Sequence, residues 1–193
     1  DSTDGGSPRN WFVDSTPNDH SEFSLTQQFF ENLTGTQQAD FFNFSNAANI
    51  PGKFEVGYLG PATSGSAAAG ADDLLSVVLH EVGHALGMAS ANNSTEDETD
   101  DGDYDFNSNF LFGQTLAIET ANESGDDNED IAHVEITSAT MTPGLASGTR
   151  MLPSHADLFS MAAVNNYVDI DVPRREMYGG TNWNTDGNWS GDK

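Results

Sequence analysis

Residues 80–88 read HEVGHALGM and set two histidines, His80 and His84, four positions apart with Glu81 between them. Residues four apart lie on one face of a helix, so both imidazoles can reach one metal ion. Glu81 can then reach a water molecule at that ion and take its proton. The stretch therefore predicts half of a catalytic zinc site, and such a site needs a third protein ligand.

The surrounding residues predict that this stretch lies on a helix. An apolar run, LLSVVL at 74–79, leads into it, and Asp72 and Asp73 precede the run as helix caps. Gly87 lies where the helix has to end in a left-handed turn, a conformation that glycine adopts without strain. A capped helix followed by this glycine favours the metal-site interpretation over two ordinary core histidines.

The remaining segments predict a mixture of helices and strands. We expect strands at 10–14, 53–59 and 131–136, helices at 24–33 and 154–164, a short helix within 110–121, and irregular acidic segments at 92–109 and 123–130. The last residues, 178–193, are rich in Asn and Gly and carry two tryptophans at a spacing of six. They predict either a linker or the start of a separate β-repeat region.

Composition excludes several classes of function. The chain has 31 acidic and 6 basic residues, a net charge of -25, which repels nucleic-acid backbones. No apolar run approaches the length of a membrane span, and the absence of cysteine excludes disulfides, a thiol nucleophile and thiolate metal sites. The acidity fits a solvated surface, a calcium-holding surface or attraction of cationic substrates. Because the sequence begins at Asp1, we expect a mature or trimmed piece of a longer chain.

One acidic segment resembles the start of a calcium loop. Residues 101–107 place Asp101, Asp103, Asp105 and Asn107 at every second position. The sixth and twelfth positions of such a loop hold phenylalanines here in place of Gly and Glu. Calcium binding and a solvated acidic loop both remain open.

The motif residues carry a resemblance to a known family. His80, Glu81, His84 and Gly87 resemble the HExxHxxG signature of the metzincin clan of zinc peptidases. In most metzincins a His or Asp three residues after the glycine is the third ligand, but Ser90 occupies that position here. The chain departs from the clan pattern at a position that the chemistry requires.

The leishmanolysin-like branch of the clan supplies an alternative position for the third ligand. Of the other histidines, His20, His133 and His155, only His133 lies shortly before a methionine, Met141, in a segment that resembles the clan's Met-turn. In that branch an insertion follows the glycine, and the third histidine arrives in a His-x-Glu context. The resemblance therefore implies His133 as third zinc ligand and an acidic insertion at about 90–130, although the insertion is short and the branch's disulfides are absent.

The resemblance covers about residues 54–167 and implies an α+β fold. We expect a small twisted sheet with an active-site helix and a C-terminal helix either side of a cleft, in a catalytic domain of residues 1–177. The strand at 53–59 would be the edge strand to which an extended substrate adds, and residues 142–153 would form the pocket wall.

The implied function is a secreted zinc endopeptidase of bacterial type that acts on protein or peptide substrates, with Glu81 as general base. Two alternatives remain: a non-catalytic binding or adhesion module on the same fold, and a zinc peptidase with an acidic third ligand, such as Glu119 or an aspartate of 97–105. Cleavage specificity and oligomeric state cannot be read from the sequence.

Overall fold

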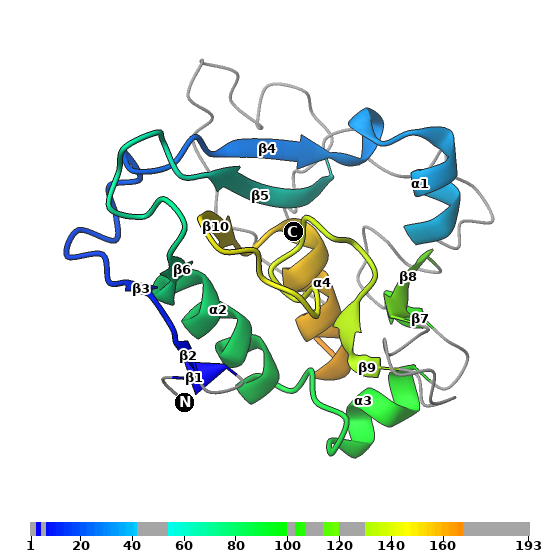
Figure 1. Cartoon of the computed structure of the whole chain (residues 1–193). Helices are drawn as coiled ribbons and strands as arrows, with labels where there is room; N and C mark the ends of the chain where they lie inside the picture. Colours follow the sequence, from blue (N-terminus) through cyan, green and yellow to red (C-terminus); the bar gives the residue numbers. More distant parts are fainter. Residues whose placement is uncertain are drawn as a thin grey trace.

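The computed structural model of the chain describes residues 3–4, 7–41, 54–99, 103–106, 114–119 and 130–167. These residues form a small domain of mixed helices and short strands (Figure 1). The strands are β1 (Thr3–Asp4), β2 (Ser7–Pro8), β3 (Trp11–Phe12), β4 (Thr26–Phe29), β5 (Glu55–Pro61), β6 (Asp72–Asp73), β7 (Asp103–Phe106), β8 (Gln114–Glu119), β9 (Asp130–Val134) and β10 (Thr149–Leu152). The helices are α1 (Gly35–Phe41), α2 (Leu74–Ala85), α3 (Asn93–Glu98) and α4 (His155–Val164), with a short 3-10 helix at Phe30–Asn32. The tail at 178–193 and the domain limit at 177 lie outside the described residues.

One of the two three-stranded antiparallel sheets in the described residues has the strand order β10-β5-β4 and lies above the helices (Figure 1). The predicted strand at 53–59 is β5, but it is the middle strand and not an edge strand. Its second neighbour is β10, which returns to the sheet after residues 135–148 and pairs Arg150 with Gly60. The expectation of an edge strand was therefore wrong, because that pairing is formed by a segment about 90 residues further along the chain.

The predicted helix at 24–33 was also wrong. Thr26–Phe29 is the strand β4, which pairs with β5 through Thr26 and Leu59. The segment forms a strand despite its helix-like pattern because it gains the backbone hydrogen bonds of the sheet. The first α-helix, α1, begins only at Gly35.

The acidic insertion contains regular structure. Asn92 caps α3, accepting from the Ser94 N–H at 3.1 Å, and β7, β8 and β9 form a second antiparallel sheet. β8 replaces the short helix predicted within 110–121. Asp103 and Asp105, two members of the calcium-like pattern, lie on β7 and not in a loop, whereas Asp101 and Asn107 lie outside the described residues.

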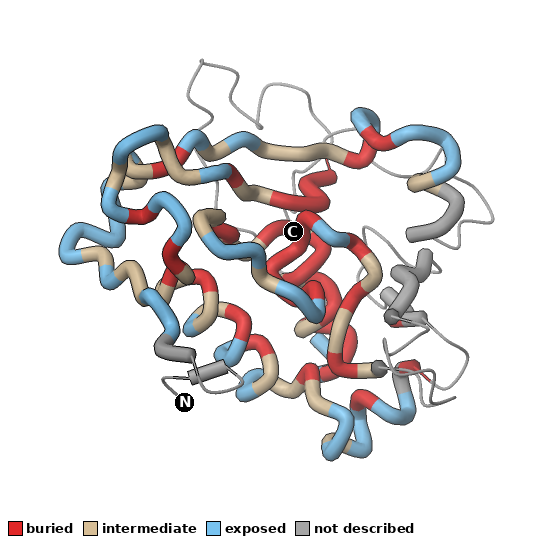
Figure 2. The backbone as a smooth tube through the Cα atoms, in the orientation of Figure 1, coloured by how far each residue is buried: buried red, intermediate tan, exposed pale blue. Residues whose placement is uncertain are grey.

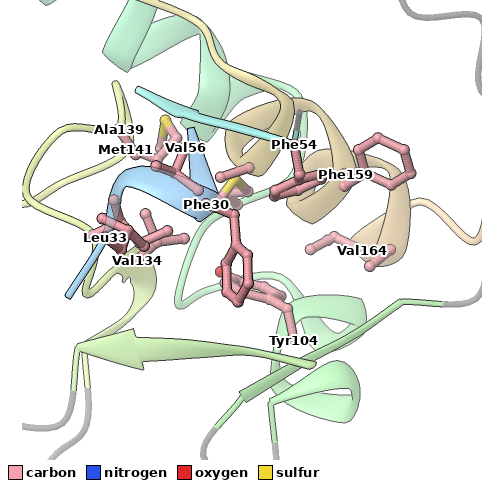
Figure 3. Close-up of a cluster of buried hydrophobic side chains, with 14 residues drawn as sticks. Phe30, Leu33, Phe54, Val56, Tyr104, Val134, Ala139, Met141, Phe159 and Val164 are labelled. Carbon is pink, nitrogen blue, oxygen red and sulfur yellow. The ribbon is translucent and has the colours of Figure 1, made fainter. Parts of the chain in front are cut away.

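The core lies between the two sheets and α4 (Figure 3). Its members come from β5, β7, β9, the turn after β9, and α4, and include Phe54, Val56, Tyr104, Val134, Met141, Phe159 and Val164. The Tyr104 hydroxyl donates to the Ile131 carbonyl, a bond between β7 and β9 within the insertion sheet, and the Tyr104 ring is buried in the core. α4 starts at the predicted residue, Ser154, in a full capping box with Asp157. Figure 2 shows buried residues concentrated along β5 and α4.

A buried arginine attaches the N-terminal segment to the start of α2. The Arg150 side chain is fully buried and pairs with Asp14 at 2.8 Å and with Asp73 at 2.9 Å. Its guanidinium also donates to the His20 ring at 3.1 Å and lies 4.3 Å from the centre of the Phe23 ring. Strand β3 pairs in parallel with β6 beside this cluster, so residues 9–23 are part of the domain.

Within the described ranges, no helix is long and apolar enough to cross a membrane.

Candidate metal centre

Helix α2 presents His80 and His84 on one side, as the spacing predicts. Its first turn is fixed by Asp73, whose carboxylate accepts from the N–H of Ser76 at 3.2 Å and from its hydroxyl at 2.6 Å. The helix ends at Ala85, and Gly87 follows its C-cap with a φ of +123°, in the region that favours glycine. The helix, the cap at Asp73 and the glycine stop are confirmed, whereas Asp72 does not cap the helix and instead binds Arg9 and Ser147.

The structure brings His133, on β9, to the two helical histidines. The Nε2 atoms of His80 and His84 lie 3.0 Å apart, and those of His80 and His133 lie 3.3 Å apart. One ligand nitrogen from each histidine lies within 4.8 Å of the others, and the group can hold a metal ion. Zinc–nitrogen bonds of about 2.0–2.1 Å in a tetrahedron put neighbouring nitrogens about 3.3 Å apart. The spacing of the three imidazoles therefore fits a single zinc-sized ion.

Backbone carbonyls set the tautomers of both helical histidines. The Nδ1 of His80 lies 2.8 Å from the Thr140 carbonyl, and the Nδ1 of His84 lies 2.6 Å from the Met88 carbonyl. Because a carbonyl oxygen only accepts, each Nδ1 carries the proton and each Nε2 is left with a lone pair. Both lone pairs point toward the centre of the group, which is how metal-binding histidines are normally oriented.

Burial keeps His80 in the ligand form. Burial lowers the pKa of His80, the Thr140 carbonyl opposes this shift, and the adjacent His84 and His133 lower the pKa further. A neutral imidazole at neutral pH is the form that binds a metal.

The segment after β9 passes beneath α2 and carries Met141. Met141 is fully buried, and a Cβ added to Gly83 would lie 2.1 Å from its sulfur. Glycine at the fourth position of HEVGH thus allows the close approach of the turn to the helix. The structure places Met141 under the helix that carries His80 and His84.

Asp157 holds this turn and was not among the predicted site residues. Its buried carboxylate accepts from the N–H groups of Thr140 at 3.2 Å and Met141 at 2.8 Å, and from the N–H of Ser154 at 2.6 Å. Burial raises the pKa of Asp157, whereas these hydrogen bonds favour the carboxylate. The Thr140 carbonyl bonds to His80, so one peptide unit joins Asp157 to the metal site. The Ser-x-x-Asp capping pattern at 154–157 was the signal that could have identified this residue.

Glu81 lies exposed on α2 between the two histidines. Its charge raises the pKa of His80 and so opposes the larger effect of burial. Because the side chain is exposed, a water molecule and a substrate can both approach it.

The other candidates do not join this group within the described residues, which do not include the Glu119 side chain. Ser90 is exposed in the segment after α2, and Glu119 lies on β8. His155 is half-buried, and its Nδ1 accepts from the Glu55 N–H at 3.1 Å. His20 contacts Arg150. Within the described residues, only the three-histidine group has metal-ligand spacing.

A small cavity of about 40 Å³ lies beside the first turns of α2. Its lining includes Val77, Leu145, Ala146 and Thr149, with Arg9 at its polar side. Val77 precedes His80 by three residues and so lies on the same side of the helix. Residues of the predicted pocket wall, 142–153, therefore form part of a hollow one helical turn from the metal site.

Comparisons of the chain with protein-family models, with curated proteins and with solved structures found no match in any of the three. The functional argument therefore rests on the residues and their geometry.

Proposed function

We propose that the chain is a zinc-dependent endopeptidase in which His80, His84 and His133 hold the metal and Glu81 is the general base. The single observation that carries this proposal is the convergence of three imidazole nitrogens, two of them 3.0 Å apart, beside an exposed carboxylate. Three protein ligands and a fourth open position are the usual composition of a catalytic zinc site.

The residues of the site have separate roles in the proposed reaction. Zinc, when bound, supplies a Lewis acid that polarises a carbonyl and lowers the pKa of a water molecule toward about 7. Glu81 takes the proton from the attacking water and delivers it to the leaving amine nitrogen. Thr140 and Met88 hold the two helical imidazoles in the tautomer that leaves Nε2 free for the metal.

The position of His133 at ligand spacing from the two helical histidines supports it as the third ligand. The proposal extends to a secreted protein of bacterial type, and that part rests on the metzincin resemblance alone.

The test is the Glu81→Gln variant, with Glu96→Gln on the exposed side of α3 as a matched control. We expect Glu81→Gln to retain one zinc per chain and to lose hydrolysis of an unfolded protein substrate by about 10²–10⁴-fold, the usual contribution of a general base. Glu96→Gln should hydrolyse the substrate at the wild-type rate. A chelator should abolish the activity of the wild type, and added zinc should restore it.

Each other outcome has a definite meaning. Loss of zinc from Glu81→Gln would make Glu81 a ligand or a structural residue. Unchanged hydrolysis would remove it from the mechanism. A wild-type chain that binds zinc stoichiometrically but cleaves no peptide would favour the binding or adhesion module.

A further inference from the structure

The backbone just after α2 holds the carbonyl group that orients His84. The Met88 carbonyl accepts from Nδ1 of His84 at 2.6 Å, and the Met88 side chain is fully buried. The nitrogen of the same peptide group belongs to Ala89, and its N–H donates to the Gly87 carbonyl at 2.8 Å. Because a peptide group is planar, a contact that fixes its nitrogen also fixes the direction of its oxygen. The orientation of His84 therefore depends on what holds the backbone at 87–89.

Thr95, on α3, contacts this backbone segment from outside. Its side chain is fully buried, and its hydroxyl donates to the Gly87 carbonyl at 2.5 Å. The hydroxyl oxygen also accepts from the Ala89 N–H at 3.4 Å, a longer and weaker contact. A threonine hydroxyl has one proton and two lone pairs, so it can make both contacts at once. One side chain thus contacts the peptide groups on both sides of Met88.

A second side chain, Asn92, supports part of the same segment. Its amide group donates to the Gly87 carbonyl at 2.8 Å, while its oxygen accepts from the Ser94 N–H at 3.1 Å. Loss of the Thr95 hydroxyl would therefore loosen the segment rather than release it. We expect an effect on the metal centre that is measurable but smaller than the loss of a ligand.

We propose that Thr95 is a positioning residue of the metal centre, which holds His84 in its ligand orientation through the Met88 carbonyl. The inference rests on the metal-binding part of the proposed function and not on peptide hydrolysis. Each helical histidine is then held through one backbone carbonyl by a buried side chain from another segment, Asp157 for His80 and Thr95 for His84. The first helix of the acidic insertion thereby takes part in building the site.

The test compares Thr95→Val with Thr99→Val, a matched control in the same segment. The Thr99 side chain is 2% exposed, and its hydroxyl donates to the Thr95 carbonyl at 2.7 Å. Each valine variant loses one buried hydroxyl bond and should lower the melting temperature of the metal-free protein. The Thr99 bond ends on the backbone of its own helix, so only the change at Thr95 should reach the metal. Thr95→Ser keeps the hydroxyl and tests for rescue.

We expect Thr95→Val to weaken zinc binding by about 10-fold in a competition titration, the lower end of the range for groups that orient a metal-binding histidine. Thr99→Val and Thr95→Ser should bind zinc as tightly as the wild type. With cobalt in place of zinc, the visible absorption spectrum reports the arrangement of the ligands, and only Thr95→Val should change it. If valine at position 95 prevents folding, the smaller pair Thr95→Ala and Thr99→Ala takes its place.

Equal zinc affinities of the two valine variants would overturn the positioning role of Thr95. Failure of Thr95→Ser to restore the affinity would also overturn it. Neither result would bear on the proposed peptidase activity. A wild type that binds zinc but cleaves no peptide would overturn that activity, while the zinc affinities of the variants would still decide the role of Thr95. A wild type that binds no zinc would overturn both.

Discussion

Replacement of Asp157 by alanine tests whether the turn beneath α2 positions the metal ligands. The change leaves the N–H groups of Thr140, Met141 and Ser154 without their acceptor. Thr140 and Met141 are fully buried and Ser154 is 1% exposed, so water cannot easily replace the carboxylate.

The expected loss of stability follows from these contacts. Each buried donor that loses its acceptor costs about 1–3 kcal/mol. The alanine variant no longer has a charge to desolvate, and this offsets part of the loss. With three donors affected and part of the loss offset, the net cost is about 3–5 kcal/mol. For a chain of this size that corresponds to a decrease in melting temperature on the order of 10 °C.

The effect should also reach the metal. The N–H of Thr140 donates to Asp157, and the carbonyl of the same residue accepts from Nδ1 of His80. Loss of a hydrogen-bonding group that orients a metal-binding histidine typically weakens metal affinity by about 10- to 100-fold. We expect a decrease in that range for Asp157→Ala. Asp157→Asn, which keeps one acceptor oxygen, should lie between alanine and the wild type in both measurements.

Calorimetry and a zinc competition titration of the folded variants measure the two effects separately. Asp97→Ala, on the exposed side of α3, is the control and should change stability by no more than about 0.5 kcal/mol. A folded Asp157→Ala variant with wild-type zinc affinity would refute the positioning role. An unchanged melting temperature would refute the account of the buried hydrogen bonds.

Three further predictions concern the third ligand, pH and salt. His133→Ala should lose zinc and hydrolysis together, whereas His155→Ala and Ser90→Ala should keep zinc; full zinc occupancy in dialysed His133→Ala would contradict the assignment. Burial and the charge of the adjacent Arg150 lower the pKa of His20 below its ordinary value of 6.5. Neutral His20 therefore stabilises the fold above pH 6.5, and this stability is lost as the pH falls from 6.5 toward the pKa of the folded state. His20→Gln should therefore show a smaller decrease in melting temperature between pH 7 and pH 5 than the wild type, and parallel curves would refute this account. The net charge of -25 predicts a melting temperature that rises with NaCl concentration, because salt screens the repulsion between the acidic side chains. The screening length falls from about 10 Å at 0.1 M to about 3 Å at 1 M salt. A melting temperature that does not change with NaCl would contradict this prediction.

Local signals in the sequence determined the helices that carry and support the site. Asp73 and Ser154 cap α2 and α4 as predicted, and Gly87 ends the first of them in a left-handed conformation. The spacing of His80 and His84 also sufficed to put both on one side of a helix. These features depend on neighbours within about one helical turn, and such neighbours are adjacent in the sequence as well as in space.

Tertiary contacts decided the features that the sequence misjudged or left open. Segment 24–33 contains a helix-like pattern but forms β4, because β5 supplies its backbone partners. β5 became a middle strand only when β10 returned to it. The resemblance, not the spacing, proposed His133, which reaches His80 across 53 positions of sequence.

The contacts that support the site from inside the domain could be identified only from the tertiary structure. The contact of Gly83 with Met141 and the bonds from Asp157 to the turn join segments between 16 and 58 positions apart. The sequence of a helix determines which residues share a face, because its geometry repeats every few residues. It does not determine what packs against that face, because a distant contact forms only when the rest of the chain closes the loop between its two ends.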